Sequence, residues 1–316
     1  MASRRTEVGN LKSQILQDFL AKTQNPDGGW GYSPGKRSAL EPTAYALMGL
    51  RHAAGAEQIL AMATQFISSN QSIDGGWPVS VTDPGAASWA TPLVGVALLS
   101  GAGESAQAQA ALQSVFSAFN RMPKSWVNRI GGWLGYRSSN VNTDLGGWSW
   151  NPGTAIWVEP TCYAILFLKK ATLDRQDQSV SRIISEAESM VYDRMCKSGG
   201  WNYGNAEVLG EELRPYPLTT TLALIALQDR SLRSENQKSL AYLKQAVSSE
   251  KSLLSLCFAG LCLDVYVQGW QNVWNQLDEF YRKISFLEDI KTTALMLITL
   301  DAREGNNPFR LKAERR

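Results

Sequence analysis

Two glutamates stand in the same local context and could do acid–base chemistry together. Glu41 opens the stretch EPTAYAL, and Glu159 opens the stretch EPTCYAI. Asp289 begins a related stretch, DIKTTAL, and is the third catalytic candidate. Carboxylates at such positions cap helix N-termini, where backbone N–H groups and the helix dipole stabilise them. The alternative is that Glu41 and Glu159 face each other, share one proton and act as a general acid.

Four cations lie at or just before the starts of apolar segments, and they are candidate ligands for an anion. They are Lys36, Arg37, Arg214 and Lys291. Together with helix N-termini, these side chains could hold a diphosphate group. Mg²⁺ is expected only if a diphosphate is bound, and no other cofactor is predicted. Ordinary solvated surface charge is the alternative interpretation.

Aromatic side chains near the same segment starts could line an apolar cavity. Trp89, Trp157 and Tyr163 are the candidate ligand-binding residues, with Tyr45 and Tyr216 nearby in the same pattern. Packing in the core is the alternative for all of them.

The sequence predicts no metal site. His52 is the single histidine, and the four cysteines contain no Cys-x-x-Cys pair. Zinc sites need clustered His and Cys ligands, and Ser–His or Cys–His catalysis would depend on His52 alone. The cysteines are typical of buried thiols in a reducing compartment, which together with the absence of a signal-peptide pattern predicts a cytoplasmic protein.

Helical segments of two kinds must position these residues, and they alternate along the chain. The amphipathic segments are 10–24, 57–70, 104–121, 176–196, 234–248 and 270–285. The segments that are apolar on nearly all sides are 43–54, 91–101, 161–172, 219–228, 252–266 and 291–301.

This alternation predicts an all-α fold, a single (α/α)6 toroid with six inner and six outer helices. A helix that is apolar all round must be covered on several sides, whereas a one-faced helix contacts solvent. Gly-Gly-Trp recurs in the turns before the inner helices, so these turns are expected at one end of the barrel, with each Trp fastening its unit. The five tryptophans are Trp30, Trp77, Trp133, Trp148 and Trp201. An open α-solenoid is the competing architecture.

The chain is expected to form one domain from residue 10 to 302. Residues 1–9 and the basic segment 303–316 are interpreted as tails. The long, tryptophan-rich segment 122–160 interrupts the repeat and is expected to lie at the mouth of the barrel. Loops of this length are often functional, so it is the candidate surface for a protein partner.

The repeat resembles that of squalene–hopene and oxidosqualene cyclases, the QW repeat. The stretches FLAKTQNPDGGWGY and FISSNQSIDGGWPV carry this resemblance through an aromatic residue, a spaced Gln and Gly-x-Trp. The stretch GGWGYSPGKRSALEPTAYALMGL is also similar to the repeat of protein prenyltransferase β subunits. Both resemblances imply an α/α toroid that handles an isoprenoid in its central cavity.

The catalytic motifs of these families are incomplete in this chain. Class II cyclases protonate an alkene with the middle Asp of an Asp-x-Asp-Asp motif. The best match is Asp289-Ile290-Lys291, which places a lysine at the proton donor. The zinc-ligand histidine of the prenyltransferase motif corresponds to Pro160. The sequence therefore predicts neither standard class II protonation nor zinc-dependent prenyl transfer.

Composition limits the remaining function classes. The formal net charge of +2 gives no field that would favour nucleic acid, and no apolar run is long enough for a transmembrane segment. Three hypotheses stay open: a toroid that binds or processes an isoprenoid or another apolar small molecule, a non-catalytic toroid for protein interaction, and a glycan-active (α/α)6 barrel that uses Glu41 and Glu159. Whether the chain is an enzyme is left open.

Overall fold

Twelve α-helices form two concentric rings in the computed structural model, which describes residues 2–79, 89–101, 106–121, 141–175, 177–269, 271–283 and 288–311. The inner ring consists of α2 (Leu40–Leu50), α4 (Ala90–Leu99), α7 (Val158–Ala171), α9 (Pro217–Ala226), α11 (Leu253–Val265) and α13 (Ile290–Arg303). The outer ring consists of α1 (Ala2–Thr23), α3 (Glu57–Ser69), α5 (Ala106–Ser117), α8 (Gln178–Asp193), α10 (Ser234–Ala246) and α12 (Gln271–Lys283).

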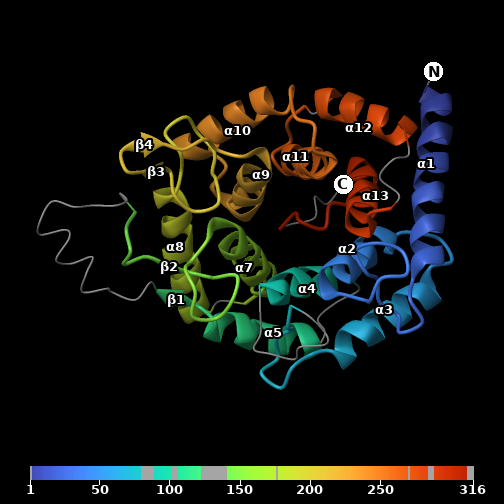
Figure 1. The fold of residues 1–316 in the computed structure, drawn as a ribbon, viewed down its shortest axis with the longest axis horizontal. Helices are drawn as coiled ribbons and strands as arrows, with labels where there is room; N and C mark the ends of the chain where they lie inside the picture. The colour runs from blue at the N-terminus through green and yellow to red at the C-terminus, as the bar shows by residue number, and fades with distance from the viewer. Residues whose placement is uncertain are drawn as a thin grey trace, which may run out of the picture.

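The inner ring is closed. Each inner helix packs against the next one along the chain, and α13 returns to pack against α2, as Figure 1 shows. The main-chain N–H of Ile290, the first residue of α13, donates to the carbonyl of Tyr32, 2.9 Å away in the first unit. The predicted (α/α)6 toroid is therefore confirmed, and the open solenoid is wrong.

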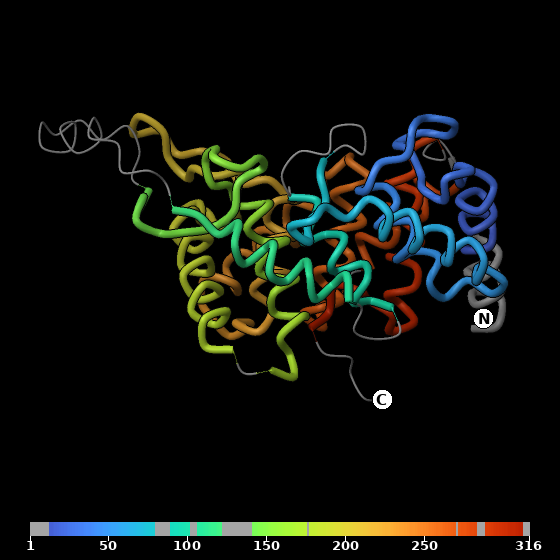
Figure 2. The backbone as a smooth tube through the Cα atoms, turned by 90° about the horizontal axis from the view of Figure 1, so that it is seen from below, coloured from blue at the N-terminus to red at the C-terminus, as the bar shows by residue number. Residues whose placement is uncertain are grey.

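Short elements complete the structure at the edges of the rings. They are the 3-10 helix η1 (Gln228–Arg230) and the two-residue strands β1 (Asn120–Arg121), β2 (Gly146–Gly147), β3 (Glu207–Val208) and β4 (Glu211–Glu212). The pairs β1–β2 and β3–β4 are antiparallel. Seen edge-on, the β3–β4 hairpin lies on the same side of the rings as the loop before α2 (Figure 2).

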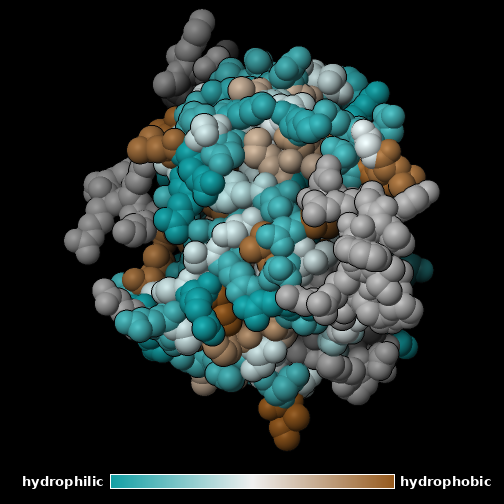
Figure 3. All heavy atoms as spheres, turned by 90° about the vertical axis from the view of Figure 1, so that its left-hand side faces the viewer, coloured by the Kyte–Doolittle hydropathy of each residue, from teal (hydrophilic) through white to brown (hydrophobic). Residues whose placement is uncertain are grey.

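The two helix patterns follow from burial. In α11 nearly every side chain from Leu253 to Leu263 is buried, because this helix has neighbours on several sides. In α8 the buried apolar residues recur at helical spacing, beginning with Val180, Ile183 and Ala187. The opposite face of such an outer helix is polar, and the side of the molecule over α8 and the β3–β4 hairpin is largely hydrophilic with separate apolar patches (Figure 3).

The Gly-Gly-Trp turns fasten the outer helix of each unit to the inner one. The indole N–H of Trp30 donates to the carbonyl of Leu20 in α1, and its main-chain N–H donates to the hydroxyl of Thr43 in α2, at 2.8 and 2.9 Å. The same two contacts recur at Trp77, Trp148 and Trp201. Trp133 lies outside the described residues. The predicted structural role of the four described tryptophans is confirmed.

A glycine is required at the first position of this turn. Gly28 has φ +88°, and a Cβ atom there would lie 2.3 Å from the carbonyl oxygen of Met62.

Two glutamines join neighbouring units. Gln24 donates to the carbonyl of Ile59 in α3, and Gln71 donates to that of Gln107 in α5, both at 2.9 Å.

Both expected tails differ in the structure. Residues 2–9 belong to α1, so the expected domain start at residue 10 falls inside a helix. Residues 304–311 pack against the end of the barrel where the inner helices finish. Phe309 is fully buried with its ring 5.9 Å from that of Phe258, and Asn307 donates to the carbonyl of Leu261 at 3.0 Å. The basic composition of this segment suggested a tail, although its single aromatic residue, Phe309, anchors it to the barrel.

Side chains fill the middle of the barrel. The hydroxyls of Tyr45 in α2 and Tyr163 in α7 are 2.8 Å apart, and the Tyr45 ring meets Phe258 of α11 edge-on at 6.3 Å. On the α4 side, Gly95 leaves room for the ring of Phe167, which would lie 2.3 Å from an added Cβ atom. These described side chains pack against one another across the barrel, and the pockets described below lie towards its two ends.

Candidate binding site at the mouth of the barrel

The repeat places one residue from each of several inner helices at the mouth, the end that carries the Gly-Gly-Trp turns. Five of the six inner helices have a threonine near their start, and the residue two positions before it lies in or just before the first turn. These residues are Glu41, Trp89, Glu159, Leu218 and Lys291. Because all six inner helices begin at the same end, the toroid gathers side chains that lie far apart in the sequence.

Glu41 is the centre of a polar cluster at this end, and only 8% of its surface is exposed. The hydroxyl of Tyr32 donates to its Oε2 atom, and the Nζ atom of Lys291 contacts its Oε1 atom, both at 2.6 Å. The ammonium of Lys291 also lies 5.6 Å from the centre of the Tyr45 ring. Both carboxylate oxygens of Glu41 therefore have a partner, and the negative charge of Glu41 neutralises Lys291.

Glu159 occupies the equivalent position on α7 and is in a different electrostatic state. Burial raises the pKa of its carboxyl from 4.5 to about 7; the positive charge of Lys291 opposes this rise and the negative charge of Glu41 adds to it. A substantial fraction of this carboxyl is consequently protonated at neutral pH. The structure thus brings Glu41, Glu159 and Lys291 into one interacting group.

Two tyrosines lie one helical turn below the glutamates. Tyr45 follows Glu41 and Tyr163 follows Glu159 by four residues, so each tyrosine lies below its glutamate on the same helix. Burial raises the pKa of both phenols well above the usual value. They stay neutral, and their mutual hydrogen bond forms the floor of the mouth.

Asp289 acts as a helix cap. Its Oδ1 atom accepts a hydrogen bond from the main-chain N–H of Thr292 at 2.9 Å, and its carbonyl accepts one from the hydroxyl of Thr293. This geometry matches the capping interpretation of the sequence. A catalytic role for Asp289 stays a prediction.

The candidate diphosphate ligands differ in their environments in the described part of the chain. Lys36, Arg37 and Arg214 are exposed, and the side-chain hydrogen bonds and ion pairs of the described residues include none of them. Lys291 is bound to Glu41. A diphosphate site formed by these four cations stays a prediction.

An apolar pocket of about 310 Å³ opens at the same end, between α4, α5 and α7. Its walls include Trp89, Phe119 and Trp148, together with Pro92 and Pro160. The volume is at the lower limit of small-molecule sites, which run from roughly 300 to 1,000 Å³. Pro160 directly follows Glu159, so the pocket borders the helix start that carries the protonated carboxyl.

Exposed aromatic rings extend this surface beyond the pocket. Trp89 meets Trp150 edge-on with ring centres 5.1 Å apart, and Tyr203 lies 5.2 Å from Tyr216. Trp157 is 36% exposed, just before α7. Residues 122–140 of the expected mouth segment lie outside the described residues, so its proposed role in binding a protein partner stays a prediction.

One residue of the cluster escaped the sequence analysis. Tyr32 follows the first Gly-Gly-Trp turn as an ordinary loop residue, and the loop between this turn and α2 brings its hydroxyl to Glu41, which lies in the same unit. Within the described residues, no group of three or more His, Cys, Asp or Glu side chains is arranged to hold a metal ion. None of the described helices is both long and apolar enough to cross a bilayer.

The comparisons with known proteins give one short sequence match and several solved structures with the same fold. No family model matches it. A stretch of 70 residues, 22% of the chain, is 41% identical to drimenyl diphosphate synthase of Streptantibioticus cattleyicolor, and the match spans 13% of that synthase's length.

Solved structures share the fold over nearly the whole chain. A variant of the type II terpene cyclase MstE from Scytonema, in complex with geranylgeranyl dihydroxybenzoate, matches with a TM-score of 0.61 and 12% identity, covering 98% of this chain and all of that one. An inactive α-1,6-mannanase variant of Salegentibacter matches with a TM-score of 0.59 and 10% identity, covering 93% and 98%. At such identities the likeness concerns the fold alone. The chain has the α/α toroid fold of type II terpene cyclases.

Proposed function

We propose that this toroid binds an uncharged, isoprenoid-type molecule at its mouth and presents to it the protonated carboxyl of Glu159. The observation that carries this proposal is the charge state of the mouth. Lys291 is neutralised by Glu41 at 2.6 Å, so the strongest candidate cation is not available for a phosphate. The stretch of identity with drimenyl diphosphate synthase and the fold shared with MstE support an isoprenoid ligand class.

The neighbouring surface has the character that such a ligand needs. The pocket beside Trp89 is lined by tryptophan, phenylalanine and proline, and rings at the mouth offer flat apolar contacts. Because the tyrosine pair closes the barrel axis, the ligand is proposed to lie across the mouth rather than deep inside. This site is shallower than the central cavity expected from the resemblance.

Glu159 is the proposed proton donor. An epoxide oxygen can accept a proton from a carboxyl that is protonated when the ligand binds, and burial keeps a substantial fraction of Glu159 in that form at neutral pH. Lys291, at the position of the proton donor in the cyclase motif, is proposed to tune the acidity of Glu159 through its charge. Glu41 holds Lys291 in place.

The glycan alternative fits the same residues less well. Glycoside hydrolysis needs two carboxyl groups that both reach the sugar. Glu41 is buried, and its two oxygen atoms are engaged by Tyr32 and Lys291. One of the two required groups is thus already occupied.

The binding experiment compares geranylgeraniol with geranylgeranyl diphosphate by calorimetric titration. The proposal expects saturable binding of the alcohol that is at least as tight as that of the diphosphate. Trp89→Ala should weaken alcohol binding by about tenfold, since it removes a large apolar contact. Trp274→Ala is the matched control, because Trp274 is also half-buried but lies on the outer helix α12.

Two results would overturn the proposal. One is the absence of binding by folded wild-type protein, which would leave the protein-interaction toroid as the better hypothesis. The other is diphosphate binding that is much tighter than alcohol binding and is lost when Lys36 and Lys291 are both replaced by alanine. That result would restore the cationic mouth expected from the sequence.

A further inference from the structure

The opposite end of the barrel, where the inner helices finish, contains a pocket lined by several charged side chains. Its volume is about 420 Å³. It lies between the ends of α2, α4 and α7, the outer helix α5 and the C-terminal segment 305–311. We call it the basal pocket. Neither the proposed function nor the repeat pattern accounts for it.

Cations dominate the wall of the basal pocket. Arg51, Lys170, Arg175 and Arg310 line it together with His52. Asp174 is the one carboxylate among the described lining residues. Arg310 is paired with Asp264 at 3.0 Å. Arg175 donates to the side-chain oxygen of Gln109 at 3.0 Å, so Arg51 and Lys170 are the two cations considered below.

Two of these cations bind only main-chain oxygen atoms. Lys170 donates to the carbonyl of Arg310 at 2.8 Å, and Arg51 donates to that of Gly101 at 3.4 Å. Within the described part of the chain, neither forms an ion pair. Basic residues near a helix C-terminus interact favourably with the helix dipole. That interaction does not explain why basic side chains from several elements line one cavity.

The local electrostatics show that the positive charges are crowded. Burial and the charge of Arg51 together lower the pKa of Lys170 to about 8. Burial, and then Arg51, lower the pKa of His52 as well. A bound anion would relieve this repulsion and replace the water that the buried ammonium has lost.

Apolar side chains form part of the remaining wall, beside the polar residues Ser100, Gln109 and Asn306. Met48, Leu99, Leu112 and Leu311 line the pocket between the charged groups. A ligand that satisfies both parts has an anionic head and a hydrocarbon portion. A phosphate monoester suits the head, since it carries up to two negative charges and accepts paired hydrogen bonds from a guanidinium.

We infer that the basal pocket binds a phosphate monoester attached to an apolar chain, with Arg51 and Lys170 holding the phosphate. This site is independent of the mouth, because it lies at the other end of the barrel and shares no residue with it. Either a soluble alkyl phosphate or a phosphatidate headgroup offers this chemistry.

The test uses hexyl phosphate as the probe, with inorganic phosphate and hexanol as comparisons. Calorimetric titration of the full chain should show saturable binding of hexyl phosphate at least about tenfold tighter than of either comparison, because both parts of the pocket contribute. Arg51→Glu and Lys170→Met should each weaken it by about tenfold or more. Arg182→Glu is the control, since Arg182 is exposed on α8 and its substitution changes the net charge as Arg51→Glu does.

Arg51 is exposed, so Arg51→Glu decides the matter even if Lys170→Met does not fold. Binding that weakens equally in Arg182→Glu, or no saturable binding of hexyl phosphate, would overturn the inference. Sedimentation with phosphatidylcholine vesicles, with and without phosphatidic acid, separates the two sources. Capture that needs phosphatidic acid and is lost in Arg51→Glu supports the headgroup, whereas hexyl phosphate binding without capture supports the soluble ligand.

Discussion

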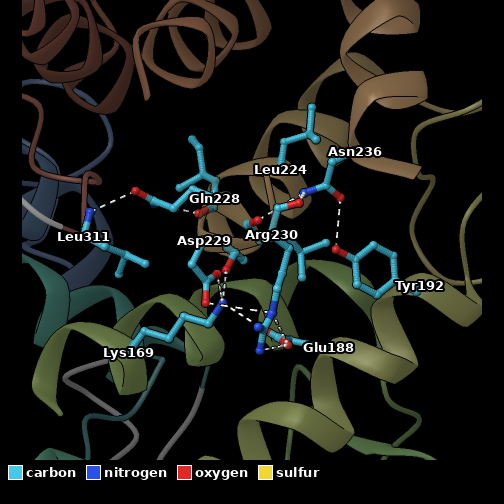
Figure 4. A network of polar contacts seen from close by, with 12 residues as sticks. Lys169, Glu188, Tyr192, Leu224, Gln228, Asp229, Arg230, Asn236 and Leu311 are labelled. Atoms are coloured by element: carbon cyan, nitrogen blue, oxygen red, sulfur yellow. Dashed lines mark hydrogen bonds and ion pairs between the residues drawn. The ribbon is translucent and has the colours of Figure 1, made fainter. Parts of the chain in front are cut away.

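Two clusters of buried charge lie at opposite ends of the barrel and are balanced differently. At the base, Lys169 binds Glu188 at 2.6 Å, contacts Asp229 and donates to the carbonyl of Ala226 (Figure 4). Arg230 binds the second oxygen of Glu188 at 3.1 Å. Around Lys169 each charged group has an opposite charge beside it. At the mouth, Lys291 and Glu41 form one pair, and Glu159 remains beside it as an additional acid.

The difference separates a structural role from a chemical one. Buried ion pairs whose charges are fully matched hold helices in place, and breaking them leaves a charge without compensation. A buried carboxyl that lacks its own cation instead keeps its proton to a higher pH. The same residue types thus fasten α7, α8 and η1 at one end and give Glu159 a proton to donate at the other.

The largest expected effect is at the base. Lys169→Met should lower the free energy of unfolding by about 3–5 kcal/mol, because Glu188 and Asp229 lose their shared cation. Guanidinium denaturation monitored by tryptophan fluorescence measures this change. Lys197→Met is the control, since Lys197 is 67% exposed at its side chain and its pairs with Glu207 and Glu212 are worth at most about 1 kcal/mol. Equal effects of the two substitutions would contradict a structural role for the ion pairs of Lys169.

The next effect is the pH dependence of stability at Glu159. Its pKa is about 7 in the folded chain against 4.5 ordinarily, so between these values the folded state binds more protons than the unfolded state. Stability from this group is present below pH 4.5 and is lost as the pH rises towards 7. Glu159→Gln has no such group. The difference between its free energy of unfolding and that of wild type should therefore increase by about 2–3 kcal/mol as the pH rises from 4.5 to 7. A difference that stays constant with pH would contradict the assignment.

The smallest expected effect concerns the pair that holds the mouth together. Lys291→Met should cost about 1–2 kcal/mol, less than Lys169→Met, because Lys291 keeps 21% of its side chain exposed and has one carboxylate partner. The control is Lys36→Met, an exposed lysine before α2, which should change stability by about 0.5 kcal/mol or less. Denaturation curves of both variants show whether the Lys291–Glu41 pair stabilises the fold as much as the ion pairs of Lys169 do.

The fold was largely predictable from the sequence, because its causes are local and repeated. Alternating one-faced and all-round apolar segments specify two rings, and each Gly-Gly-Trp turn repeats the same hydrogen bonds to a helix end and a threonine. The matching EPT contexts of Glu41 and Glu159 likewise predicted that both residues would lie at one end.

The pairing within the site was not predictable, because it depends on how the ring closes. Lys291 reaches Glu41 only when the last inner helix packs against the first, and no local pattern encodes which side chain then points inward. Tyr32 reaches Glu41 through the loop that precedes α2. The filled barrel axis likewise depends on how the ring closes. Tyr45 and Tyr163 look equally suited to lining a cavity or closing it until their hydroxyls are seen to meet.

The central claim is that the pKa of Glu159 is raised to about 7, so that a substantial fraction of this carboxyl is protonated at neutral pH. Carbon-13 NMR of protein labelled at the glutamate carboxyls, titrated from about pH 3 to 9, measures this directly. Glu159→Gln identifies the resonance by its disappearance. The account predicts a midpoint near 7, moving higher in Lys291→Met as the opposing positive charge is removed. A midpoint near 4.5 that Lys291→Met leaves unchanged would contradict it.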